Sequence, residues 1–156
     1  MSGAKIVIER TYRAALQDVW DLWTTKDGFE SWWGPQGFRA DVHELDARPG
    51  GALRYDMVAD SPDMIAAMQQ MGRPASSSVR VRFAEVKPQS RLVLRSVIDF
   101  LPGVEPYEND IEVDFAPVGD GVRMTVTLSP YHSEEFTKMA AQGMTSQITK
   151  LDERFR

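Results

Sequence analysis

From Lys5 to Tyr12 the side chains alternate between two sets, and β-branched residues occur throughout. This alternation is typical of a strand with one face turned inward. The spacing then becomes helical, with apolar residues at Leu16, Val19, Trp20 and Trp23. A second short helix is predicted over residues 26–32, before Gly34 and Pro35 stop it. The chain is therefore expected to begin with one strand and two short helices.

The middle of the chain predicts a series of strands and one inserted helix. Residues 42–48 and 52–58 flank Pro49-Gly50-Gly51, where the glycines suit a tight hairpin turn. Residues 60–74 break the alternation, because Ser61 can cap a helix, Pro62 suits its first turn and Gly72 can end it. Alternation resumes over residues 79–86, 91–100, 107–116 and 122–129, which predicts a meander with one dry face.

The last segment, residues 133–155, predicts a long amphipathic helix. Ser133 is a suitable N-cap, and Glu134 and Glu135 complement the positive end of the helix dipole. One apolar stripe comprises Phe136, Met139, Ala140, Gly143, Met144, Gln147, Ile148, Leu151 and Phe155. We therefore predict an α+β fold in which a curved antiparallel sheet of six to seven strands lies under this C-terminal helix.

Composition narrows the class of protein. The 156 residues suit a single domain over residues 1–156, with the inserted helix at about 61–72 and no linker or repeat. A net charge of -5 disfavours binding to nucleic acid or to an anionic membrane surface. There is no cysteine, no signal-peptide pattern at the N-terminus and no apolar run long enough to span a bilayer, so we expect a cytoplasmic protein.

The major catalytic and cofactor motifs are absent from the sequence. It contains no GxSxG, no Walker loop and no GxGxxG before a helix, so nucleophile-elbow, phosphate-binding and dinucleotide-binding sites are not predicted. The two histidines, His43 and His132, are far apart and belong to no HExxH motif, so neither a metal site nor a cofactor is expected.

Several short motifs, taken in order, carry a family resemblance. They are Val19-Trp20, Trp32-Trp33-Gly34-Pro35, Gly37-Phe38, Pro49-Gly50-Gly51, and Gly143 with Leu151. With the predicted element order, the chain resembles the bacterial homologues of the heat-shock chaperone ATPase activator, in the START-related superfamily that includes the birch pollen allergen fold. It departs from the family where Gly143-Met144 replaces the usual Gly-Trp. The resemblance implies a helix-grip architecture with a cavity between sheet and helix.

This cavity predicts a binding site for a small hydrophobic or aromatic ligand. Trp33 is expected at its rim with its indole N–H free for a ligand, and Gly143 is expected to leave space at its centre. Arg95, Asp99, Tyr107 and His132 are candidate polar anchors. The remaining candidate lining residues are Phe38, Tyr55, Phe83, Phe115, Met124, Phe136, Met139, Met144 and Ile148.

Other functions stay open at this point. An enzyme of the cyclase or hydratase kind, found in the same superfamily, would need His132 and Asp99 as an acid–base pair within reach of its substrate. A chaperone cofactor rests on fold analogy alone, and we do not expect a chaperone contact. The methionines of the inserted helix, Met64, Met68 and Met71, suit either a lid over the ligand or the contact of a homodimer.

Overall fold

The computed structural model describes residues 5–99 and 101–155. The predicted elements are present, although their ends shift by a few residues. The chain begins with β1 (Ile6–Tyr12), α1 (Leu16–Thr24) and α2 (Lys26–Glu30), followed by the hairpin of β2 (Phe38–Leu45) and β3 (Ala52–Ala59). The inserted helix α3 (Pro62–Gln70) precedes β4 (Ser76–Lys87), β5 (Arg91–Ile98), β6 (Tyr107–Val118), β7 (Gly121–Leu128) and α4 (Glu134–Arg154). The strand predicted over residues 91–100 ends at Phe100, which lies outside the described residues.

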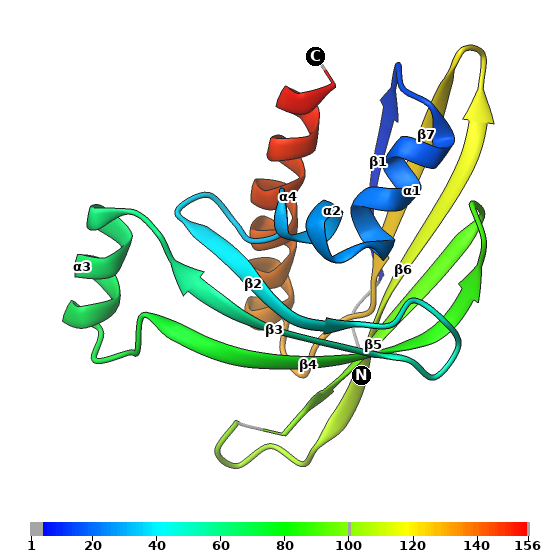
Figure 1. The fold of residues 1–156 in the computed structure, drawn as a ribbon. Helices are drawn as coiled ribbons and strands as arrows, with labels where there is room; N and C mark the ends of the chain where they lie inside the picture. The colour runs from blue at the N-terminus through cyan, green and yellow to red at the C-terminus, as the bar shows by residue number, and fades with distance from the viewer. Residues whose placement is uncertain (1–4, 100, 156) are drawn as a thin grey trace.

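The strands form one antiparallel sheet of seven strands in the order β1-β7-β6-β5-β4-β3-β2. The first strand returns to the end of the sheet, where Ile6 lies opposite Leu128 and Tyr12 opposite Val122. Figure 1 shows the sheet curving around the long helix α4, and α1 and α2 pack on the same face of the sheet, since buried residues of α1 and α4 belong to one core. The predicted curved sheet, its long C-terminal helix and the two short helices after the first strand are thus confirmed.

Two neighbouring strands, β4 and β5, pair along only part of their length. The pairing of β4 with β5 runs only from Lys87 opposite Arg91 to Arg82 opposite Arg95. Beyond this point residues 76–81 pair only with β3, and residues 96–98 pair only with β6. Among the described residues, the sheet therefore opens between these two segments.

Aromatic side chains from α1, α2 and the following turn fill one end of the core. Trp23, Phe29 and Trp32 are almost completely buried, and the Trp23 and Trp32 rings meet edge to face with their centroids 4.9 Å apart. The indole N–H of Trp32 donates to the Leu22 carbonyl at 2.8 Å, which joins the turn after α2 to α1. Trp20 meets Phe115 of β6 edge to face at 5.5 Å, so α1 also covers this part of the sheet.

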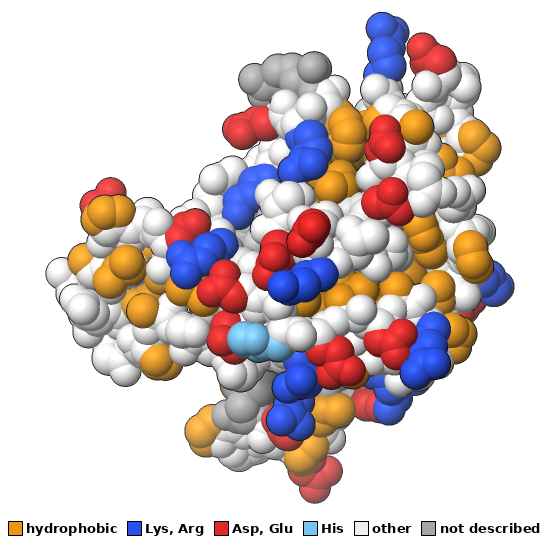
Figure 2. All heavy atoms as spheres, viewed as in Figure 1, with side chains coloured by type: hydrophobic (Ala, Val, Ile, Leu, Met, Phe, Trp, Pro, Cys, Tyr) orange, Lys and Arg blue, Asp and Glu red, His pale blue; other side chains and the backbone are white. Residues whose placement is uncertain are grey.

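The inserted helix α3 projects from the body of the fold at the connection between β3 and β4 (Figure 1). Its predicted cap is present, since the Ser61 hydroxyl accepts from the Met64 N–H at 3.1 Å. None of its residues is buried, and hydrophobic side chains are visible on its surface in Figure 2. Ile65 of this helix is 36% exposed, and Met71, just after it, is 59% exposed.

Candidate functional site

A cavity of about 710 Å³ lies where β4 and β5 part. Its apolar lining comes from β3 to β6, from the turn after α2 and from the start of α4. The lining residues are Trp33, Leu53, Tyr55, Ser78, Val79, Arg80, Val81, Arg82, Leu94, Arg95, Ser96, Val97, Ile98, Asp99, Glu108, Ile111, Tyr131 and Phe136. Because the strands are unpaired here, the same opening that widens the core also connects it with the outer face of the sheet.

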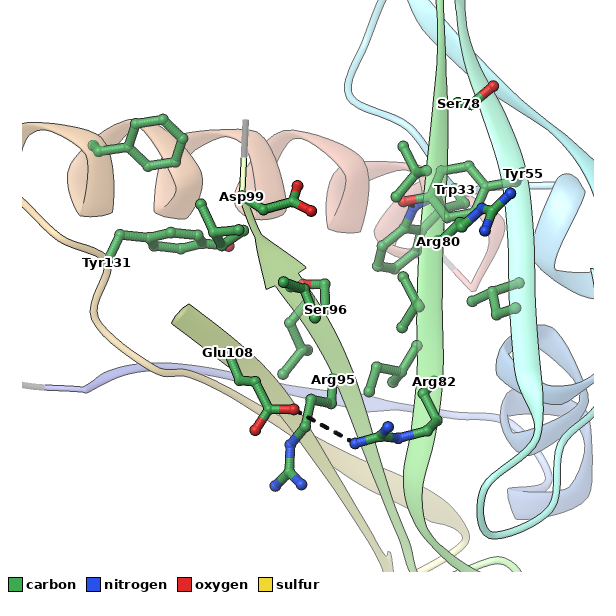
Figure 3. Close-up of a pocket in the computed structure, with 18 residues that line it drawn as sticks. Trp33, Tyr55, Ser78, Arg80, Arg82, Arg95, Ser96, Asp99, Glu108 and Tyr131 are labelled. Atoms are coloured by element: carbon green, nitrogen blue, oxygen red, sulfur yellow. Dashed lines mark hydrogen bonds and ion pairs between the residues drawn. The ribbon is translucent and has the colours of Figure 1, made fainter. Parts of the chain in front are cut away.

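The strand alternation divides this lining into an apolar interior and a charged mouth. Leu53, Leu94 and Ile111 lie on the inward face, and Leu94 is opposite Ile111 in the β5–β6 pairing. At the mouth, Arg82 pairs with Glu108 at 3.5 Å, and Figure 3 shows this contact beside the opening. Charged groups therefore meet water at the mouth while apolar groups line the interior.

Two aromatic residues form the inner polar contact of the cavity. The Trp33 indole N–H donates to the Tyr55 hydroxyl oxygen at 3.0 Å, and both side chains are buried. Burial raises the pKa of the Tyr55 phenol to about 12, despite the opposing effect of the Trp33 hydrogen bond, so the phenol keeps its proton at neutral pH. The prediction of a free Trp33 N–H is therefore wrong, because the hydroxyl of Tyr55, 22 positions along the chain, accepts its hydrogen bond.

Further charged side chains surround the mouth, and some of them form ion pairs while others do not. Arg95 makes two hydrogen bonds with Asp110, at 2.8 and 2.9 Å, on the outer face. These bonds hold the pKa of Asp110 below its usual value. Within the described part of the chain, neither Arg80 nor Asp99 forms an ion pair, although both line the cavity.

Helix α4 holds the turn that carries Trp33 in place. The buried Gln147 side chain accepts from the Gly34 N–H at 3.0 Å, and the Ser146 hydroxyl accepts from the Gln36 N–H at 3.0 Å. The Lys150 ammonium donates to the Phe38 carbonyl at 3.0 Å. These bonds fix Trp33 at the cavity because the helix satisfies backbone groups that a turn leaves without partners.

The structure brings some of the predicted site residues together and separates others. Trp33, Tyr55, Arg95, Asp99 and Phe136 line the cavity. The core residues Phe83, Phe115, Met124, Met144 and Ile148 are buried outside the lining. For Phe115 the reason is Trp20, whose ring occupies the space above that strand. Phe38 is half-buried beside α4 and also does not line the cavity.

Two residues of α4 lie elsewhere than the predicted stripe placed them. Met139 is 58% exposed, because the buried face of the helix passes through Thr137, which is two residues and more than half a turn away. Gly143 faces the turn after α2, where a Cβ atom built on it would lie 3.9 Å from the Pro35 side chain. Neither residue lines the cavity.

The expected acid–base pair is not formed. The Nδ1 atom of His132 lies 3.1 Å from the Tyr107 hydroxyl, which also accepts from the His132 backbone N–H at 3.2 Å. Both side chains belong to an exposed contact, and neither lines the cavity. In the described chain no hydrogen bond joins His132 to Asp99, so the orienting carboxylate that a general base needs is missing.

Sequence reasoning missed several residues that line the cavity, among them Leu53, Leu94, Ile111 and Tyr131, and it also missed the buried Asn109. For Tyr131, burial raises the pKa of its phenol. Asn109 is almost fully buried, and its amide group donates to the Ser129 carbonyl at 3.2 Å. The alternation of β6 places Asn109 on the inward face with Ile111, which was the available signal for it.

Residues 5–99 and 101–155 contain neither a metal-binding cluster nor a helix that could span a membrane. No group of three or more histidine and carboxylate side chains is placed to hold a metal ion. No helix in that part of the chain has both the length and the apolar character needed to cross a bilayer.

Comparison with known proteins gives one family and a set of similar folds. The sequence profile of the family described as "Activator of Hsp90 ATPase homolog 1-like protein" matches residues 13–156. No curated protein sequence matches the chain.

Solved structures of similar fold come from several bacteria. A protein of Chromobacterium violaceum is 20% identical, with 97% of this chain and 96% of that chain covered and a TM-score of 0.75. The AHSA1 protein of Silicibacter pomeroyi is 20% identical over 97% and 96% of the two chains, with a TM-score of 0.74. A protein of Arthrobacter aurescens is 23% identical over 93% and 81%, with a TM-score of 0.72. At these identities the likeness concerns the fold.

Proposed function

This chain belongs to the family of Activator of Hsp90 ATPase homolog 1-like proteins, and from its cavity we propose that it binds a small hydrophobic or aromatic molecule between the sheet and α4. The observation that carries the proposal is the cavity of about 710 Å³ with its mainly apolar interior. Sites for small organic ligands usually enclose about 300–1,000 Å³ and are lined by apolar side chains with few polar groups. The cavity has the size and the lining of such a site.

The parted strands supply the way in. A ligand that passes between residues 76–81 and 96–98 meets no backbone hydrogen bond that joins β4 to β5. Inside, the Leu53, Leu94 and Ile111 side chains remove its apolar surface from water, at about 25 cal/mol for each Å² buried. Trp33 presents an aromatic ring whose position the α4 contacts fix.

We propose binding rather than a reaction, because His132 is bonded to Tyr107 outside the cavity and lacks the expected carboxylate partner. A homodimer through α3 and a cytoplasmic location remain predictions. The interpretation of α3 as a lid has no support from its position. No residue of this helix lines the cavity, and its Met64 side chain lies against Gly37 instead.

A blocking substitution tests the proposal. Val79 lines the cavity, so Val79→Trp should fill the opening and weaken binding of the neutral fluorescent probe phenylnaphthylamine at least about tenfold, since the larger side chain takes the ligand's place. Val7→Trp is the matched control, because Val7 on β1 is 60% exposed and lies outside the cavity lining. Fluorescence titration measures the affinity, and near-ultraviolet circular dichroism checks that each variant is folded. Equal binding by the wild type and a folded Val79→Trp variant would contradict the proposed site.

A further inference from the structure

We propose that the molecule bound in this cavity carries a neutral hydrogen-bond acceptor, such as the carbonyl oxygen of an aromatic ketone, that accepts from the Tyr55 hydroxyl. This inference rests on the proposed function and names the chemical class of its ligand.

The Tyr55 hydroxyl has an unused donor. Tyr55 is only 6% exposed and lines the cavity. Its oxygen accepts from the Trp33 indole N–H, a group that has no lone pair with which to accept in return. Among the described residues, no group accepts a hydrogen bond from the Tyr55 hydroxyl. A buried donor left without a partner is unfavourable, so an acceptor atom placed in the cavity gains a bond for which no protein group competes.

The charges around the cavity favour a neutral acceptor. The arginines in the lining, Arg80, Arg82 and Arg95, belong to the charged mouth and outer sheet face, and two of them already pair with Glu108 and Asp110. Among the described residues, no cationic side chain is hydrogen-bonded to the buried Trp33–Tyr55 pair. An anion placed there would lose its hydration without gaining an opposite charge, which costs more than burying a carbonyl group.

Tyr131 supplies a second donor on the other side of the cavity. In Figure 3 Tyr131 lies near Asp99 at the end of β5, while Tyr55 lies beside Trp33 across the opening. In the described structure the Tyr131 hydroxyl makes no hydrogen bond, whereas the Tyr107 hydroxyl is occupied by His132. Burial raises the pKa values of both Tyr55 and Tyr131, so each phenol keeps its proton and offers a donor to the ligand.

A matched pair of probes tests the inference. Acetylnaphthalene and isopropenylnaphthalene have almost the same shape, and the carbonyl oxygen of the first replaces the terminal methylene carbon of the second. Isothermal titration of the full chain should give a preference for the ketone of about threefold to tenfold, the usual net effect of one hydrogen bond. Tyr55→Phe should abolish the preference while the hydrocarbon still binds.

Controls separate a lost donor from a damaged site. Tyr107→Phe removes a phenol hydroxyl that does not line the cavity, so it should leave the ketone preference unchanged. Tyr55→Phe also leaves the Trp33 N–H without its acceptor; if this variant does not fold, the carbonyl carbon-13 shift of labelled acetylnaphthalene bound to the wild type reports the hydrogen bond directly. A downfield shift relative to the ketone in hexane supports the inference, and an unchanged shift overturns it.

The outcomes distinguish the two proposals. Equal affinity of the wild type for both probes, or a preference that survives in Tyr55→Phe, overturns the inference but leaves the binding function intact. Equal affinity is also the result expected if a water molecule satisfies the Tyr55 hydroxyl in the bound state. If neither probe binds, the proposed function itself fails.

Discussion

Gly143 and Gly28 both lie in helices, yet replacement by alanine should change stability in opposite directions. At Gly143 a new Cβ atom would contact only the Pro35 side chain, at an ordinary distance of 3.9 Å. Alanine favours a helix interior over glycine by about 0.8–1.0 kcal/mol because it restricts the unfolded chain. Gly143→Ala should therefore raise the free energy of unfolding by about 1 kcal/mol.

At Gly28 the same helical preference is outweighed by a clash. A Cβ atom there would press on the Asp21 carbonyl oxygen and would lie 2.6 Å from the Thr25 hydroxyl, which caps α2. Overpacking of this kind usually costs about 1–3 kcal/mol, so Gly28→Ala should lower the free energy of unfolding.

Thermal unfolding followed by circular dichroism measures both changes. For a chain of 156 residues, about 1 kcal/mol corresponds to a shift of roughly 2–4 °C, so Gly143→Ala should melt higher and Gly28→Ala lower than the wild type. Gly143→Leu separates this account from the sequence-based prediction that Gly143 lines the cavity. In the structure the leucine side chain of this variant would push against the turn at Pro35 and lower stability, rather than fill the cavity. A lower melting temperature for Gly143→Ala would refute the reasoning.

Two further substitutions test how the helix and the sheet are held. Gln147→Met should leave the Gly34 N–H without its acceptor and lower the free energy of unfolding by about 1–3 kcal/mol, as measured by urea titration. Gln142→Met, on the exposed face of α4, is the control and should have little effect in that titration. The pKa of Asp110 lies below its usual 3.8 because Arg95 donates hydrogen bonds to the carboxylate, so this pair stabilises the fold above pH 3.8 and the gain is lost as the pH falls through the lowered pKa. In Asp110→Asn the free energy of unfolding should therefore fall less steeply than in the wild type as the pH is lowered. An unchanged dependence of this free energy on pH would count against the contribution of the pair.

The sequence was sufficient for the elements of the fold because most of each element keeps one period, although register shifts interrupt the alternation of β2 after Val42 and of β4 after Phe83. The alternation in residues 91–98 and the Ser61 and Ser133 caps are local signals, and the structure contains all of them. The exact face of α4 was harder to predict. Thr137 is buried although it is polar, because its hydroxyl accepts from the Tyr131 N–H at 2.8 Å and donates to the Ser133 carbonyl at 2.8 Å. Hydrophobicity alone selected Met139 instead.

The candidate site depended on contacts that no local pattern contains. The Trp33–Tyr55 hydrogen bond joins residues on a turn and a strand, and it forms only after the sheet has folded. The parting of β4 and β5 is equally hidden, because Val79 and Val81 keep their alternation with or without a paired neighbour. Sequence reasoning therefore placed Trp33, Tyr55 and Phe136 correctly in the lining. It missed the apolar wall residues Leu53, Leu94 and Ile111, and it missed the hydrogen bond inside the cavity.

The parting of these strands also has a mechanical consequence. Only the segment from Arg82 to Lys87 ties β4 to β5, so the two parts of the sheet meet along a short seam. Beyond the seam, a change in strand twist can alter the width of the gap without breaking any backbone bond between β4 and β5. The width of the gap can therefore change as the strands bend, while the seam keeps the two parts of the sheet in register.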